Sequence, residues 1–386
     1  MTRNVYLDYA STTPVDPRVL KTMLPYFSKK FGNTMSFHKI GAEANDAVEK
    51  AREIIAESIN AKPEEIIFTS SATEANNLAI KSVALANKSK GKHVIISAIE
   101  HDSVLNSAMW LKTHGFEITE LPVDKNGFVK IADLEKVIRK DTILVSIIHA
   151  NNEIGTIQNL KLLGAICKKH NIFFHTDASQ SFTKIPIDVA KENIDLFTAS
   201  SHKIYGPKGA GFLYLNSGIP ITPLLHGGGH EKNLRSSTLN VPAIIGFAKA
   251  VEINLKNLKT ENEKVIKLRD KLITGILKKI PNTKLNGDPK KRLANNANIT
   301  FSFIEGESLL LELNNYGIYV STGSACSSPS LAPSHVLMAL GKNAEDAHGS
   351  IRFSLGRWTT EEEINYVLKV LPEIVERLRK FSPFKK

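Results

Sequence analysis

The stretch IFFHTDASQSFTKIPIDVAKENIDLFTASSHKIYGPKGAGFLYL, at residues 172–215, decides the fold. It contains three short apolar segments, at residues 172–174, 196–197 and 211–215, and polar residues follow the first two directly. Short apolar runs bounded by turn residues predict buried strands. Because ligands bind at the carboxyl ends of the strands in open α/β sheets, the residues after these strands are the first candidates for a functional site.

The same alternation of patterns extends upstream. Strands are predicted at residues 66–68, 94–96 and 143–148, and helices are predicted to begin near residues 72 and 101 and to cover residues 160–169. An amphipathic helix is predicted over residues 41–60, with one apolar stripe formed by Ala44, Val48, Ala51, Ile55 and Ile59. Short strands separated by helices predict an α/β fold, with a mostly parallel sheet between helices.

The pattern changes in the second half of the chain. A long helix rich in Lys, Glu and Leu is predicted from about Val241 to Ile280, as a connector. Beyond it, strands are predicted at residues 298–303 and 351–354 and a helix at residues 308–314, and Thr360 and Glu363 have the capping-box spacing that opens a last helix. We therefore predict a large domain at residues 15–255 and a smaller α+β domain built from residues 1–14 and 256–386.

Composition limits the class of protein. Of the 386 residues, 42% are hydrophobic and 23% are charged, which is ordinary for a globular protein. No apolar run approaches the roughly 18 residues that cross a membrane, and the first residues show no signal-peptide pattern, so we expect a cytoplasmic protein without a membrane partner. The net charge of +11 comes from scattered lysines without interleaved aromatic residues, which favours a solvated surface over direct nucleic-acid binding.

Two residues carry the chemical argument. Lys203 lies in SSHKIYGPKG (residues 200–209), and an amine held at a strand end can bind an aldehyde covalently. Cys326 lies in STGSACSSPS (residues 321–330), where small polar residues predict a mobile loop. The other cysteine, Cys167, fits the apolar side of a helix and is predicted to be inert; two cysteines build neither a disulfide framework nor a zinc site. Together Lys203 and Cys326 indicate an enzyme that removes an atom from an amino acid and passes it on.

The neighbouring motifs contain the other groups that pyridoxal phosphate chemistry needs. Asp177 follows a strand and is placed to pair with the pyridine nitrogen, although an N-cap role explains its position equally well. Gln180, three residues later, is placed to donate to the ring hydroxyl. Ala72 and Thr73 open a helix after a strand, as a phosphate cradle or as part of a plain helix cap.

Three further residues have a functional and a structural interpretation. His101, just after a strand, could stack on the ring and move protons, because histidine titrates near neutral pH, or it could be structural. Asn152 could bond the ring oxygen or a substrate carboxylate, or be a turn residue. Arg352, inside an apolar strand, could bind the carboxylate of an amino acid or form an internal salt bridge. The glycine-rich residues 226–230 indicate a tight loop rather than a metal site.

The order and spacing of nine motifs resemble the IscS/NifS cysteine desulfurases, pyridoxal-phosphate enzymes of fold type I in the class V aminotransferase group. The resemblance implies a large domain with a mostly parallel seven-stranded sheet between helices. The motifs are YLDYASTTPVDPR (6–18), FTSSATEANNLAIK (68–81), IHANNEIG (148–155), HTDASQS (175–181), SHKIYGPKG (201–209), HGGGHE (226–231), RSSTL (235–239), STGSACSS (321–328) and SIRFSLGRWTTEEEI (350–364). The sequence departs from the family pattern at residues 32–36, where GNTMS replaces a segment that usually contains proline, and it ends in FSPFKK without the longer tail that some members use to dock a scaffold.

The resemblance implies a role for each candidate residue. Lys203 would hold pyridoxal 5'-phosphate covalently, Asp177 would pair with its ring nitrogen, and His101 would stack on the ring and move protons. The remaining contacts would be Gln180 and Asn152 to the ring oxygen; Ala72, Thr73, Ser200, Ser201 and His202 to the phosphate; Thr238 from the other subunit of a homodimer; and Asn152 with Arg352 to the substrate carboxylate.

The resemblance also implies the reaction. L-cysteine would be converted to L-alanine, and Cys326 would take the sulfur as a persulfide and deliver it to an iron–sulfur scaffold, to tRNA thiolation or to another sulfur-acceptor protein. No metal site of the protein's own is expected, although Cys326 would be a ligand for a transferred iron–sulfur cluster. The alternatives are a selenocysteine lyase, another class V pyridoxal-phosphate enzyme, or a basic binding protein that has lost activity.

Overall fold

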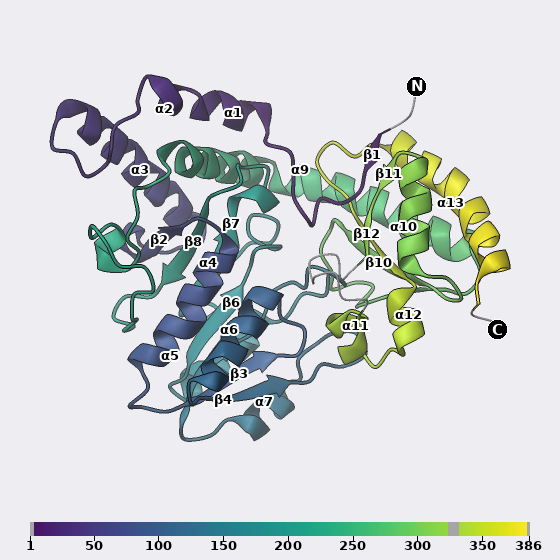
Figure 1. Cartoon of the computed structure of the whole chain (residues 1–386), viewed down its shortest axis with the longest axis horizontal. Coiled ribbons are helices and arrows are strands. Elements are labelled where there is room, and N and C mark those ends of the chain that lie inside the picture. Colours follow the sequence, from purple (N-terminus) through teal and green to yellow (C-terminus); the bar gives the residue numbers. More distant parts are fainter. Residues whose placement is uncertain (1–3, 323–331, 384–386) are drawn as a thin grey trace.

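The structure is a computed structural model that describes residues 4–322 and 332–383 (Figure 1). Its largest sheet has seven strands, in the order β2-β8-β7-β6-β5-β3-β4. These are β2 (Ile66–Thr69), β3 (His93–Ser97), β4 (Glu117–Leu121), β5 (Thr142–Ser146), β6 (Phe173–Asp177), β7 (Leu196–Ser200) and β8 (Gly211–Leu215). Strand β8 is antiparallel to both of its neighbours, and the other pairs are parallel. The carboxyl ends of β2, β3, β5, β6 and β7 therefore meet at one edge of the sheet.

Helices bury both faces of this sheet. Alternate residues of a strand point to opposite faces, so Val94 and Ile96 pack in one apolar cluster and Ile95 in another. One face is covered by α3 (Lys39–Glu57), α8 (Leu160–Lys169) and the first part of α9 (Val241–Lys279), with α1 (Pro17–Met23) and α2 (Pro25–Ser28) packed on α9 and α7 (Ile131–Val137) beside α8. The other face is covered by α4 (Ala72–Asn77), the π-helical turn Leu78–Ser82, α5 (Val83–Ala86) and α6 (Asp102–Thr113).

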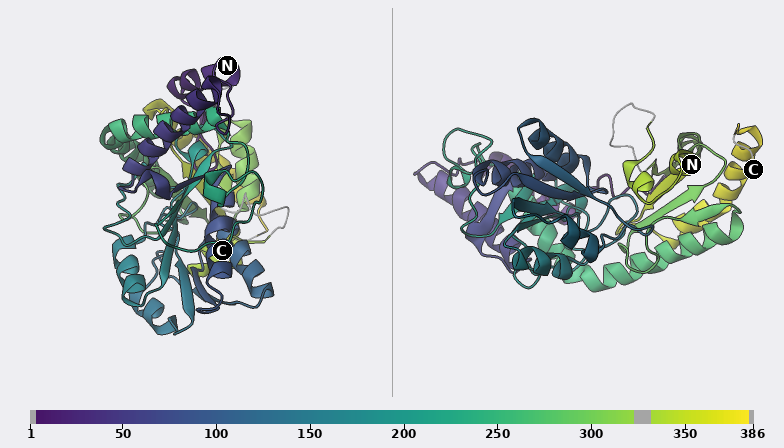
Figure 2. Two further views of the ribbon diagram at one scale, coloured as in Figure 1. Left: turned by 90° about the vertical axis from the view of Figure 1, so that its left-hand side faces the viewer. Right: turned by 90° about the horizontal axis from the view of Figure 1, so that it is seen from below.

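Helix α9 joins this layered part of the chain to a smaller one (Figure 2). Residues up to Ile253 pack in the core of the large sheet, and residues from Val265 onward pack in a separate apolar cluster. That second cluster lies on an antiparallel sheet of order β12-β13-β10-β9 and on the parallel pair β1-β11. The elements are β1 (Val5–Tyr6), β9 (Thr283–Leu285), β10 (Asn296–Phe301), α10 (Gly306–Asn315), β11 (Ile318–Tyr319), β12 (Ser321–Thr322), α11 (His335–Ala339), α12 (Ala344–His348), β13 (Ser350–Ser354) and α13 (Glu361–Phe381).

The predicted fold class is confirmed. The predicted long helix agrees with α9, and Thr360 and Glu363 form the capping box that was expected to open α13. The prediction missed β4, an edge strand whose first four residues are exposed or half-buried and therefore carry no apolar pattern. The domain boundaries stay a prediction. No helix in the described part of the chain is long and apolar enough to span a membrane.

Candidate active site

A cleft lies at the carboxyl edge of the large sheet, where it meets β13 and the N-terminal residues. Its walls are formed by Ala10, Ser11, Ser71, Ala72, Thr73, His101, Ser103, Ile148, Asn152, Asp177, Ser179, Gln180, His202, Lys203 and Arg352. Most of the residues that the sequence nominated are therefore brought together from segments far apart in the chain. We call residues 8–16 the N-terminal strap, because they run along one wall of this cleft and bond to both parts of the chain.

Lys203 reaches into the cleft from the turn after β7. It is the last residue of a 3-10 helix, Ser201–Lys203, that directly follows the strand. Its Nζ donates to the backbone oxygen of Ala10 at 2.8 Å and of Ser11 at 2.7 Å. The amine is therefore aimed at the strap, inside the cleft, where a carbonyl ligand would meet it.

Asp177 is the last residue of β6 and is 4% exposed. Its Oδ2 accepts from Asn76 Nδ2 at 2.7 Å, and its Oδ1 accepts from the backbone N–H of Ser179 at 2.9 Å. Asn76 Nδ2 also donates to Ser103 Oγ at 2.8 Å. The carboxylate bonds to the turn that follows it and lines the cleft, but no helix begins between β6 and β7, where the structure describes every residue, so the N-cap interpretation of Asp177 is wrong.

The start of α4 combines a helix cap with an open first turn. Ser71 Oγ accepts from the backbone N–H of Glu74 at 3.2 Å, so the plain cap belongs to Ser71. Ala72 and Thr73 line the cleft, where the amide groups of a first helical turn favour an anion. Arg235, the first residue of the RSSTL motif, pairs with the Glu74 carboxylate at 2.6 Å.

Two histidines line the cleft, His101 and His202. His101 is the N-cap of α6, and its Nδ1 accepts from the backbone N–H of Ser103 at 3.1 Å. A backbone N–H can only donate, so the neutral ring of His101 carries its proton on Nε2. His202 lies 3.1 Å from Thr12 Oγ1 through Nδ1, and burial lowers the pKa of His202 to about 4, so its ring is neutral at neutral pH.

Asn152 and Arg352 face the cleft from opposite parts of the chain. The Asn152 carbonyl accepts from Arg352 Nη1 at 3.1 Å, and Arg352 Nη2 donates to Asp8 Oδ1 at 3.0 Å and Ser11 Oγ at 2.9 Å. The internal salt bridge that was one interpretation of Arg352 is thus present. Its Nε, however, is buried without a hydrogen-bond partner among the described residues. Because an unpaired buried donor is costly, a ligand that accepts from this Nε–H would be favoured.

The polar atoms near Lys203 fit pyridoxal phosphate. Gln180 Oε1, Ser200 Oγ and Ser201 Oγ are buried and have no hydrogen-bond partner in the described part of the chain. Hydroxyls, a histidine and the first turn of α4 are groups that bind phosphate oxygens. The donor set, the Lys203 amine and the Asp177 carboxylate together match the three ends of this cofactor: phosphate, aldehyde and ring nitrogen.

Some nominated residues lie elsewhere. Ser200 and Ser201 directly precede the lining residues but do not form the wall themselves, and Thr238 is exposed. Cys326 lies outside the described residues. The two flanks of its segment are described: Ser321 pairs with Arg352 in the sheet, and Ser334 Oγ donates to Glu153 Oε2 at 2.6 Å. Cys167 is buried, and burial raises the pKa of its thiol, so its predicted inertness agrees with its surroundings.

The sequence reasoning missed the strap and the partners of Asp177. Ala10 and Ser11 act through backbone oxygens, which leave no side-chain signal. Asp8 gives no sign in the sequence that it pairs with Arg352, 344 residues away. Asn76 could have been found, because it lies three residues after Thr73 and therefore on the same face of the helix.

Comparisons with known proteins agree along the whole chain. The family model described as aminotransferase class-V matches residues 5–367. The chain is 54% identical over 379 residues to "Cysteine desulfurase IscS" of Methanosarcina thermophila, covering 98% of this chain and 94% of that protein. It is 53% identical over 385 residues to a protein of the same name from Dictyoglomus turgidum, covering 100% and 98%. A solved structure titled "NIFS-LIKE PROTEIN" superposes with a TM-score of 0.92 at 42% identity, covering 97% of this chain and 100% of that one.

Proposed function

This chain belongs to the aminotransferase class-V family and is a cysteine desulfurase of the IscS type, and from this premise we propose how its residues carry out the reaction. L-cysteine is converted to L-alanine, and the sulfur atom passes to Cys326 as a persulfide. The observation that carries the proposal is the convergence of Lys203, Asp177, Gln180 and Arg352 on one cleft.

The family implies pyridoxal 5'-phosphate as cofactor. When bound, it draws electrons from the α-carbon of an amino acid and so makes the α-proton and the substrate sulfur reactive. Lys203 would bind its aldehyde and Asp177 would hold its ring nitrogen protonated. Gln180 Nε2 donates to the Ala10 carbonyl, so Gln180 would accept from the ring hydroxyl at Oε1 and not donate to it. Asn152 would bond the ring oxygen, and His101 would lie against the ring. The phosphate would be held by Ala72, Thr73, Ser200, Ser201 and His202.

Arg352 orients the substrate. Its guanidinium is fixed on three sides by Asn152, Asp8 and Ser11, and its Nε remains for the carboxylate of L-cysteine. Asn152 lines the same wall and can donate its amide to that carboxylate. Once the amino group of L-cysteine has displaced Lys203 from the aldehyde, the freed Lys203 amine would take the α-proton as general base. His101 is the second candidate for proton transfer: its neutral ring presents an Nε2–H donor, and it can release that proton only after Nδ1 has been protonated and has lost its bond from the Ser103 N–H.

Cys326 completes the transfer. Its thiolate attacks the substrate sulfur, an S–S bond forms, the C–S bond breaks, and the carbon skeleton takes up a proton and leaves as alanine. Both flanks of its segment support this role, since Ser321 pairs with Arg352 and Ser334 bonds to Glu153, next to Asn152. We therefore propose that Cys326, whose segment is joined to these two flanks, reaches the substrate.

We extend the proposal to a homodimer. A contiguous stretch of the chain from α1 to the start of α3 leaves large apolar side chains exposed: Leu20, Leu24, Phe27, Phe31, Met35, Phe37 and Ile40. Exposed apolar surface of this extent marks an interface. Thr238, exposed in one chain, would then contribute to the phosphate site of the partner. Light scattering of the purified protein at two concentrations tests the dimer.

The destination of the sulfur is a separate proposal. An iron–sulfur scaffold is the acceptor we favour, with Cys326 as a ligand of the transferred cluster, while tRNA thiolation and other acceptor proteins remain as further destinations. A cytoplasmic location stays a prediction from the sequence. Selenocysteine lyase activity is the alternative function, and comparing alanine produced from L-cysteine and from L-selenocysteine separates the two.

The deciding experiment measures alanine and persulfide from L-cysteine with the protein loaded with pyridoxal 5'-phosphate. Lys203→Ala should lose both the visible absorbance of the bound cofactor and alanine formation. Lys208→Ala is the matched control, because Lys208 is an exposed lysine of the same motif and should behave as wild type. Full alanine formation by Lys203→Ala would overturn the proposed function.

A further inference from the structure

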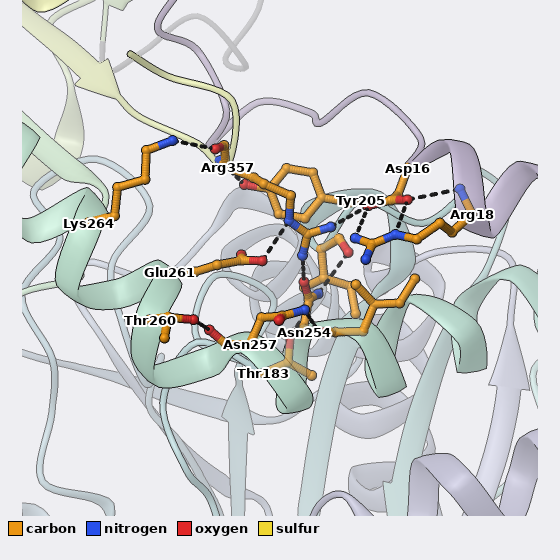
Figure 3. A network of polar contacts seen from close by, with 12 residues as sticks. Asp16, Arg18, Thr183, Tyr205, Asn254, Asn257, Thr260, Glu261, Lys264 and Arg357 are labelled. Atoms are coloured by element: carbon orange, nitrogen blue, oxygen red, sulfur yellow. Dashed lines mark hydrogen bonds and ion pairs between the residues drawn. The ribbon is translucent and has the colours of Figure 1, made fainter. Parts of the chain in front are cut away.

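A second polar centre, separate from the residues that line the cleft, surrounds Arg357 (Figure 3). Arg357 follows the end of β13 by three residues, and its side chain is only 10% exposed. Its guanidinium bonds to the Asp16 carboxylate of the N-terminal strap and to the Asn254 side-chain oxygen. Its Nε also lies 2.8 Å from the carboxylate of Glu261. Because Asn254 and Glu261 belong to α9, one side chain joins the strap, α9 and the segment after β13.

The same residue holds the turn that follows Lys203. The backbone N–H of Arg357 donates to Tyr205 Oη at 2.7 Å, and its guanidinium carbon lies 4.2 Å from the centre of the Tyr205 ring. Tyr205 has a φ of 67°, in the left-handed region that residues other than glycine rarely adopt. Strained backbone of this kind persists only where its surroundings hold it, and it is concentrated at functional sites. The strained residue here lies two positions after Lys203.

The strap holds Tyr205 from its other side. The Tyr205 N–H donates to Thr13 Oγ1 at 2.8 Å, and its carbonyl accepts from the Asp16 N–H at 2.9 Å. Asp16 also accepts from Arg18 and from Arg357, and the Arg18 side chain is the largest influence that lowers the pKa of Asp16 to about 2. Asp16 is thus ionised at neutral pH and offers Arg357 a permanent counter-charge.

A short, closely packed segment connects Arg357 to Arg352. Ser354 accepts at its carbonyl from the Tyr9 N–H at 3.3 Å, and its Oγ accepts from the Ala10 N–H at 2.9 Å. A Cβ on Gly356 would lie 2.2 Å from the Tyr9 ring, so only glycine allows the strap this close. The backbone between Arg352 and Arg357 therefore has little freedom to move relative to the strap.

We propose that Arg357 is a positioning residue that ties the segment carrying Arg352 to the turn carrying Lys203, and so sets the distance between the substrate carboxylate and the cofactor-binding amine. The inference rests on the proposed function, which assigns these two groups to substrate and cofactor. Arg357 itself does not line the cleft. Its effect on catalysis is transmitted through Tyr205 on one side and through residues 352–356 on the other.

The test compares Arg357→Met with Arg269→Met in protein loaded with pyridoxal 5'-phosphate. Arg269 is a matched control, since it is a buried arginine on α9 whose donors go to the Leu293 carbonyl and to Asp270. For Arg357→Met we expect cofactor binding to remain. We expect kcat/KM for L-cysteine to fall by about 10²-fold, as when reacting groups are misplaced by about 1 Å. The pH midpoint of the visible absorbance should also move by about one unit, because the turn that carries the cofactor-linked amine has relaxed.

Three results would overturn the inference. The first is an Arg357→Met protein in which two quantities stay within about threefold of wild type: kcat/KM for L-cysteine, and the ionisation constant given by the absorbance midpoint. A second is an equal change in Arg269→Met, which would make the effect one of general stability. If Arg357→Met does not fold, the same measurements are made on Arg357→Lys and Tyr205→Phe, because each of these changes removes only part of the network. Wild-type values for both of these variants are the third result that would overturn the inference. A wild-type protein that binds the cofactor but makes no alanine would refute the proposed function alone, since the absorbance titration still reports on Arg357.

Discussion

Replacing Arg352 with lysine should raise the KM for L-cysteine while the cofactor remains bound. Arg352 is 3% exposed in its side chain and pairs with Asp8, which is 19% exposed. Lysine keeps a positive charge for Asp8 and so avoids leaving a half-buried carboxylate unpaired. It cannot supply the Nε–H, which is the donor left without a partner among the described residues.

The expected size follows from that single contact. A hydrogen bond to a charged group contributes about 1.5–3 kcal/mol, and about 1.4 kcal/mol corresponds to a factor of ten in binding. The KM for L-cysteine should therefore rise about 10- to 100-fold. Alanine formation is measured over a range of L-cysteine concentrations, with the visible absorbance recorded in parallel to show that the cofactor is retained. Arg269→Lys makes the same chemical change in a buried arginine of α9 and should leave KM unchanged. A KM for Arg352→Lys within about twofold of wild type would show that the substrate carboxylate does not depend on this guanidinium.

Three further predictions concern titrating groups. Burial raises the pKa of the Cys167 thiol. A thiol reagent should therefore modify Cys326 alone in the native protein at neutral pH and both cysteines after unfolding, as measured by peptide mass spectrometry. Modification of Cys167 in the native protein would contradict this prediction. Burial lowers the pKa of His149 from 6.5 to about 3. Its neutral ring therefore stabilises the fold above pH 6.5, and this contribution is lost as the pH falls toward 3. In urea unfolding His149→Gln should lose less stability than wild type over that pH range, and parallel curves of stability against pH for the two proteins would refute the assignment. Burial raises the pKa of Glu100 from 4.5 to about 8. The stabilising contribution of its neutral carboxyl is therefore complete below pH 4.5 and declines as the pH rises to 8. The urea midpoint of Glu100→Gln should rise relative to that of wild type over this interval, and a constant difference between the two midpoints would contradict the prediction.

The elements of the large sheet could be predicted because their signals are local. Buried parallel strands read as apolar runs, and the polar residues after them marked the edge at which Lys203, Asp177 and His101 meet. Arg352 could be nominated because a charge inside an apolar strand requires a partner. The edge strand β4 was not predicted, because its first four residues are exposed or half-buried and its sequence contains no apolar run.

The N-terminal strap could not be predicted, for a physical reason. Its contribution comes from the backbone oxygens of Ala10 and Ser11 and from pairings across more than 300 residues, such as Asp8 with Arg352 and Asp16 with Arg357. No local pattern encodes a contact of that kind. Asn152 and Arg352 each combine their structural interpretation with a place in the cleft, so alternatives that the sequence posed as exclusive coexist in the structure.

The most direct test of sulfur transfer is a mass measurement on the peptide that contains Cys326. The protein loaded with pyridoxal 5'-phosphate is mixed with L-cysteine, free thiols are blocked, and the protein is digested without reductant. The peptide with Cys326 should gain the mass of one sulfur atom, the peptide with Cys167 should not, and Lys203→Ala should show no gain in either. Alanine formed at the wild-type rate without added sulfur on Cys326 would contradict the account.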